Sequence, residues 1–242
     1  MNSPARLSRS LGAAAVLLSV GVSCCVLAKA PDKAGPTEGK VRCLRLQQSN
    51  MYFGDCTIYA ADDALKIVFK SGKWMNICRG PKWELYVLNP GEKIYCHTAL
   101  KDWKPARMNL AMLSKGGQGL APTKRMAIIA GLRAAEYMPI ESPGGDRYSG
   151  AKSVWVVADR TFPEAINTIL AGNDFIANTH RLPLRVVFHT ASIDKSVDTS
   201  AAGEVDMPRS FFDIPFGMRE TKDPQEVMNS GIMDVVKDMA GF

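Results

Sequence analysis

Cysteines are the residues of this chain whose number and spacing point most directly to chemistry. Two of the six lie in the apolar N-terminal segment, and the other four lie within residues 43–96. No C-x-x-C pair is present, so the pattern does not predict a structural zinc site. An even number of cysteines in an exported chain predicts disulfides, with three connectivities open. The disulfide candidates are Cys43, Cys56, Cys78 and Cys96, and the Cys43–Cys56 pairing is slightly favoured.

The three histidines offer little support for catalysis. His97, His180 and His189 are far apart in the sequence, and no G-x-S-x-G, H-E-x-x-H or P-loop motif accompanies them. The adjacent pair Cys96-His97 is typical of a strand with one residue facing each side. The sequence therefore predicts a non-enzymatic protein with no catalytic residue, no metal ligand and no cofactor. A secreted hydrolase that uses one of these histidines remains a less favoured alternative.

The first 30 residues have the pattern of a secretory signal peptide. Residues 1–10 carry two arginines and no acid, and residues 11–27 are uncharged and mostly apolar. Small residues then flank Lys29, which predicts cleavage after Ala30. We therefore expect an exported protein, either periplasmic or extracellular. Two alternatives stay open, an uncleaved N-terminal anchor and a lipoprotein anchored at Cys24 or Cys25.

The overall composition is that of a globular protein, with 46% hydrophobic and 22% charged residues among 242. The formal net charge is +6, and it falls to +3 without the three basic residues of the leader. This excess is too small to indicate a nucleic-acid-binding protein. We therefore predict no nucleic-acid partner.

The mature chain is expected to form one domain. Residues 31–44 are rich in proline, glycine and charge, which predicts a linker, and residues 45–242 form the domain. Short apolar runs with turn signals about every ten residues predict an antiparallel meander. A helix is expected from Pro163. The capping signature at residues 223–226 predicts a C-terminal helix over 224–239. This pattern predicts an α+β fold, a sheet with a few α-helices.

Three segments resemble the periplasmic lipoprotein-carrier superfamily of the LolA and LppX/LprG type. The first is Lys82-Trp83-Glu84-Leu85-Tyr86-Val87, an early strand followed by a short turn. The second is Leu182-Pro183-Leu184-Arg185-Val186, which is similar to a corner that leads into a strand of the family. The third is Phe212-Asp213-Ile214-Pro215-Phe216-Gly217-Met218, which is similar to an element that closes many such domains.

The resemblance implies a half-barrel, a curved antiparallel sheet closed by a few α-helices over an apolar cavity that holds acyl chains. The expected function is to bind a lipid or another apolar ligand, with a lipid or lipoprotein acyl chain, a membrane surface or an envelope protein as partner. A ligand-free structural or interaction protein of the same fold is the alternative. The cavity candidates are large apolar residues of the predicted strands: Leu65, Ile67, Phe69, Trp83, Leu85, Val87, Trp155, Leu184, Val186 and Phe188.

Overall fold

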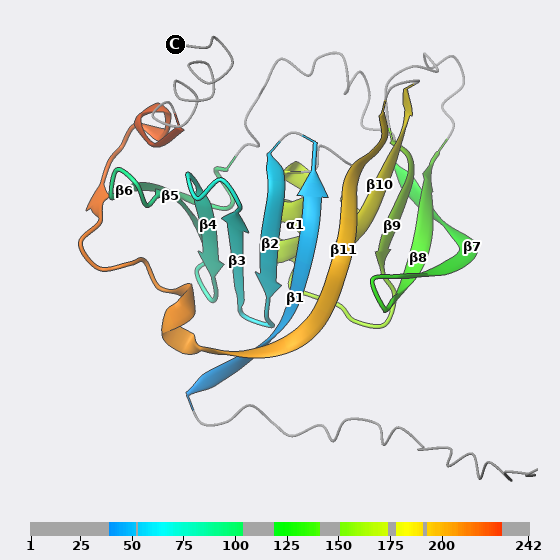
Figure 1. The fold of residues 1–242 in the computed structure, drawn as a ribbon, viewed down its shortest axis with the longest axis horizontal. Coiled ribbons are helices and arrows are strands. Elements are labelled where there is room, and N and C mark those ends of the chain that lie inside the picture. Colours follow the sequence, from blue (N-terminus) through cyan, green and yellow to red (C-terminus); the bar gives the residue numbers. More distant parts are fainter. Residues whose placement is uncertain are drawn as a thin grey trace, which may run out of the picture. The chain divides into compact units, whose positions relative to one another are not determined.

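One 12-stranded β-sheet dominates the computed structural model, which describes residues 39–51, 53–103, 119–140, 151–173, 178–190 and 193–228. The predicted signal peptide, its cleavage site and most of the predicted C-terminal helix lie outside these residues. The strand order is β12-β6-β5-β4-β3-β2-β1-β11-β10-β9-β8-β7. Figure 1 shows this sheet with α1 behind β1 and β2.

The sheet consists of two antiparallel meanders that β1 and β11 join along their lengths. The strands are β1 (Lys40–Asn50), β2 (Gly54–Ala60), β3 (Ala64–Phe69), β4 (Met75–Arg79), β5 (Glu84–Asn89), β6 (Ile94–Ala99), β7 (Leu120–Ile129), β8 (Leu132–Pro139), β9 (Ala151–Val157), β10 (Pro183–Thr190), β11 (Ile193–Pro208) and β12 (Arg219–Glu220). The helical elements are α1 (Glu164–Asn173), the 3₁₀ helix η2 (Arg209–Phe212) and residues 224–228.

The predicted α+β class is wrong. The described residues form a mainly-β protein, a large open sheet that is mixed because β12 pairs in parallel with β6. A few helices closing one face would leave the other face to water, whereas here both faces bury apolar side chains, as described below. Among the described residues, no helix is long and apolar enough to cross a bilayer.

The predicted linker also ends earlier than expected. The runs at 54–60 and 64–69 coincide with β2 and β3. By contrast, β1 begins at Lys40, inside the segment that we interpreted as a linker. The alternation of polar and apolar side chains in its first residues is too weak to predict a strand from the sequence. These residues nevertheless pair with β11 from Lys40↔Pro208 onward. Long-range pairing with β11 therefore decides where this strand begins.

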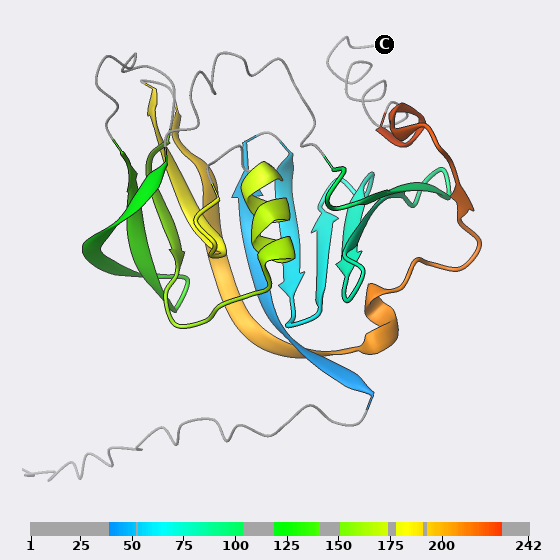
Figure 2. The same ribbon diagram turned by 180° about the vertical axis from the view of Figure 1, so that it is seen from behind.

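The main core lies between the sheet and α1. Ile166, Ile169 and Leu170 are spaced as one apolar helix face, and they are buried against residues of β1 to β5 such as Leu46 and Leu65. Figure 2 shows α1 lying across this side of the sheet, which we call the inner face. Half-buried aromatic residues, among them Trp83 and Trp155, pack around the same core.

The opposite, outer face carries separate apolar clusters. On β9, Val154 and Val156 belong to one of these clusters, while the alternating Trp155 and Val157 pack on the core with α1. Near the start of β1 and β3, Phe212 of η2 covers another small cluster that contains Cys43. Residues 209–220, which we call the strap, lead from the end of β11 through η2 to β12 (Figure 1).

Candidate functional site

The ten predicted cavity residues do not line one cavity surface. Leu65, Ile67, Phe69, Leu85 and Leu184 are buried in the core that packs on α1. Trp83, Val87 and Trp155 are half-buried at the margin of that core. Val186 and Phe188 are buried in the outer-face cluster of β9 to β11.

A break in the β10 register separates residues that we expected on one face. Strict alternation would place Leu184, Val186 and Phe188 together, but the pairing with β9 shifts between Pro183 and Arg185. Leu184 then packs on the side of α1, and Val186 packs in the outer cluster. The prediction of one common face for these three residues is therefore wrong.

The predicted disulfide is absent, because Cys43, Cys56, Cys78 and Cys96 are all free and buried. Cys56 lies opposite Gln48, five residues along β1 from Cys43. At ~3.4 Å per residue this offset is about 17 Å, and an odd offset also places the two side chains on opposite faces. Cys78 and Cys96 are separated by β5, which leaves about 9.5 Å between their strands against the ~7 Å limit for a disulfide.

Burial makes three of these thiols weaker acids than a free cysteine. Desolvation raises the pKa of Cys43 to about 11 and that of Cys78 to about 12. It also raises the pKa of Cys96. A protonated thiol is a poor nucleophile and a poor metal ligand. These cysteines therefore serve as small apolar core residues.

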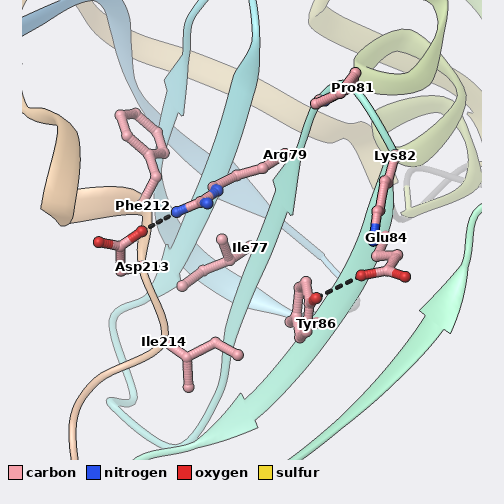
Figure 3. Close-up of a pocket in the computed structure, with 10 residues that line it drawn as sticks. Ile77, Arg79, Pro81, Lys82, Glu84, Tyr86, Phe212, Asp213 and Ile214 are labelled. Carbon is pink, nitrogen blue, oxygen red and sulfur yellow. Dashed lines mark hydrogen bonds and ion pairs between the residues drawn. The ribbon is translucent and has the colours of Figure 1, made fainter.

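The described residues form a groove on the outer face, with a volume of about 460 Å³. Figure 3 shows the groove between the β4–β5 hairpin and the part of the strap that follows η2. Neighbouring β4 and β5 place Ile77 and Tyr86 opposite one another along one side of it. The lining residues are Ile77, Arg79, Gly80, Pro81, Lys82, Glu84, Tyr86, Phe212, Asp213 and Ile214.

The tight β4–β5 turn shapes one end of this groove. The turn closes with a hydrogen bond from the Trp83 amide to the Arg79 carbonyl at 2.9 Å. Trp83 then packs across the turn, and a Cβ at Gly80 would lie only 3.2 Å from its ring. Glycine at this position therefore lets the hairpin pack tightly. Arg79 therefore stands at the start of a short turn and Lys82 lies within it, and both line the groove.

Basic residues fasten the strap that forms the opposite wall. Lys66 Nζ donates a hydrogen bond of 2.7 Å to the Phe211 carbonyl and lies 4.1 Å from the centre of the Phe211 ring. Arg79 forms an ion pair with Asp213, and Arg209 forms one with Asp63. Lys66 is itself buried, which lowers the pKa of its ammonium group. Within the described residues no carboxylate pairs with Lys66.

The polar side chains of the groove largely bind one another. The Tyr86 hydroxyl donates a hydrogen bond of 2.6 Å to Glu84 Oε2. This bond, reinforced by burial and the nearby charge, raises the pKa of Tyr86 to about 12. The Arg79 guanidinium faces Asp213 across the groove, as Figure 3 shows. In the described part of the chain, Lys82 forms no ion pair.

The histidines do not form a catalytic constellation in the described residues. His97 is exposed while Cys96 is buried, which confirms the prediction of one residue on each side of the strand. His97 Nδ1 lies 3.2 Å from Glu220, and His180 Nδ1 lies 2.9 Å from Glu164 on α1. The His189 side chain lies outside the described part. Nowhere in that part do three or more histidine, cysteine or acidic side chains gather as metal ligands would.

Sequence reasoning missed the groove, because we sought a site among the residues that face the helix. Ile77 and Tyr86 lie opposite one another on β4 and β5, and neither is among the predicted cavity residues. The signal that could have found them is the presence of Ile77 and Tyr86 on the face opposite Leu85 and Val87, since both are large and largely apolar for a fully exposed face. The strap lies in the segment whose resemblance we noted at residues 212–218.

Comparison with known proteins gives weak structural likenesses. No family model and no curated protein matches the chain. A structure of PNGF-II is 12% identical with a TM-score of 0.42, and the match covers 78% of this chain and 32% of that one. An uncharacterized conserved protein from Thermus thermophilus is 9% identical with a TM-score of 0.43, and the match covers 75% of this chain and 90% of that one. The chain thus spans about a third of PNGF-II, and neither likeness carries a functional argument.

Proposed function

We propose that this chain is an exported, non-enzymatic binding protein that holds the apolar part of an amphipathic ligand, such as an acyl chain, in the outer-face groove. The observation that carries the proposal is the groove itself. Its volume of about 460 Å³ lies within the ~300–1,000 Å³ range of small-molecule sites. Ile77, Phe212 and Ile214 supply apolar contacts, and charged groups stand at its margins, which suits a ligand with both characters.

The state of the polar groups supports binding rather than catalysis. A catalytic acid or base needs a pKa near the working pH, and the Tyr86 hydroxyl is shifted away from neutrality. Tyr86 and Glu84 already satisfy each other, as do Arg79 and Asp213. Such paired groups can orient a ligand head group. The leader at residues 1–30 supports export.

A fluorescence titration tests the proposal. N-phenylnaphthylamine, an uncharged aromatic probe that brightens in apolar sites, should bind the wild-type protein saturably at one site. Ile214→Ser removes an apolar contact from the strap without entering the core, and we expect it to weaken binding about tenfold. Ile128→Ser is the matched control, because Ile128 is an exposed isoleucine on β7 at the other end of the sheet.

Two outcomes would overturn the proposal. One is the absence of saturable binding, which would favour a ligand-free structural or interaction protein. The other is an equal loss of affinity in both serine variants, which would place the probe outside the groove. Thermal unfolding of each serine variant checks that it is folded at the temperature of the titration.

A further inference from the structure

We propose that Arg79 recognises an anionic head group of the ligand and that Asp213 is an internal competitor for Arg79. The inference rests on the proposed function and names the chemistry of its ligand. In the structure, the Asp213 carboxylate occupies the place on the guanidinium that a carboxylate, phosphate or sulfonate of a ligand would take. Binding would then replace the contact between Asp213 and Arg79 with a contact between the ligand's anionic group and Arg79.

The geometry around this ion pair favours exchange. Both side chains are about half exposed, so the ion pair can separate without moving a buried side chain. Such exposed pairs contribute little stability, so displacing the Asp213 carboxylate from Arg79 costs little free energy. Asp213 follows η2 directly, and its own amide bonds the Ser210 carbonyl, so its backbone can stay in place while its side chain leaves Arg79.

The charges nearby favour an anion over a cation. Lys82 lines the same groove and forms no ion pair with any described residue. Lys66 lies directly opposite Ile77 on the next strand, and among the described residues its buried ammonium contacts the Phe211 carbonyl and ring without pairing with a carboxylate. With Arg79 these two lysines outnumber the carboxylates of Glu84 and Asp213, and Glu84 keeps its negative charge while it accepts the Tyr86 hydrogen bond.

Two probes that differ by one anionic group separate this inference from apolar binding. Anilinonaphthalene sulfonate carries the aromatic skeleton of N-phenylnaphthylamine with a sulfonate added. Asp213→Asn should tighten binding of the sulfonate probe about three- to tenfold, and by a clearly larger factor than any change in the affinity of the neutral probe. Arg79→Gln should weaken binding of the sulfonate probe more than binding of the neutral probe. Arg79→Gln combined with Asp213→Asn should behave as Arg79→Gln, because the competitor matters only while Arg79 is present.

Each result decides a different point. If Asp213→Asn changes neither probe, or changes both by the same factor, Asp213 is only a strap contact and the inference is wrong. If the neutral probe binds in the groove while the sulfonate probe shows no dependence on Arg79, the inference fails and the proposed function stands. If neither probe binds the wild type saturably, both fail. The tightening should also shrink as salt rises, because salt screens exposed charges.

Discussion

At the residue scale, the buried carboxylate of Glu136 on β8 is the clearest electrostatic constraint. Only 3% of its side chain is exposed, and it accepts hydrogen bonds of 3.0 Å from both Thr123 and Arg125. Removing Arg125 would leave a buried charge with a single hydroxyl partner. The chain offers a matched control in Arg133, whose partner Asp159 is more than half exposed.

We predict that Arg125→Met lowers the free energy of unfolding by about 3 kcal/mol, because an unpaired buried charge is costly. Arg133→Met should cost less than about 0.5 kcal/mol, as is usual for exposed pairs. Urea denaturation of the two variants measures the difference. Equal losses would show that burial of Glu136 does not set the strength of its ion pair.

A second prediction at this scale concerns the thiols. In the chain beginning at Pro31, the four buried cysteines should resist a thiol reagent at pH 8 and should all react in denaturant without a reductant. Their folded pKa values, about 11 for Cys43 and about 12 for Cys78, are raised above the ordinary 9.0. The stability that they contribute is therefore complete below pH 9 and is lost as the pH rises toward 11–12.

Thiol counting and alkaline unfolding check this prediction. Fewer than four reactive thiols in denaturant would mean that a disulfide exists. A free energy of unfolding that stays constant from pH 9 to pH 12 would contradict the role given to burial.

In a regular strand, alternate side chains face opposite sides of the sheet, and this alternation decided which buried residues could be predicted from the sequence. Leu65, Ile67 and Phe69 are buried as expected, because β3 is regular and its neighbours pair without a shift. Leu184 and Val186 could not be assigned to faces, because the register shift in β10 depends on its partner strand and has no signal in the local sequence. The disulfide prediction failed for a similar reason, since facing and register decide which cysteines meet.

At the element scale, packing of α1 on the sheet predicts how the inner face responds to added volume. Leu184 is fully buried in the same cluster as Ile166 and Ile169 of α1. Leu184→Trp should therefore overpack the core and lower the free energy of unfolding by about 1–3 kcal/mol. Denaturation of the variant measures this loss. Unchanged stability would instead reveal an empty cavity on the inner face, as the carrier resemblance implied.

Short elements were predictable where turn signals enclose them, as at 54–60 and 64–69. The strap was not, because its position depends on contacts with distant residues. Lys66 is 145 positions from Phe211, and Arg79 is 134 positions from Asp213. β12 is likewise defined by two residues paired with β6 and has no strand pattern of its own.

At the scale of the whole molecule, the pairing of β1 with β11 turns two local meanders into one sheet. Sequence spacing could predict each meander, but it could not show that residues 40–50 return to the other end of the chain. The groove forms where the strap crosses the outer side of this sheet, from β3 to β6. The proposed function therefore depends on whether a ligand lies at that groove or among the inner-face residues.

Nuclear Overhauser contacts from bound N-phenylnaphthylamine to methyl-labelled isoleucine and leucine residues test this most directly. If the ligand lies in the groove, contacts are expected from the probe to the methyl groups of Ile77 and Ile214, which line it. Contacts to Leu65, Ile67 or Ile169, which lie in the core on the other face, would contradict it and place the ligand beneath α1.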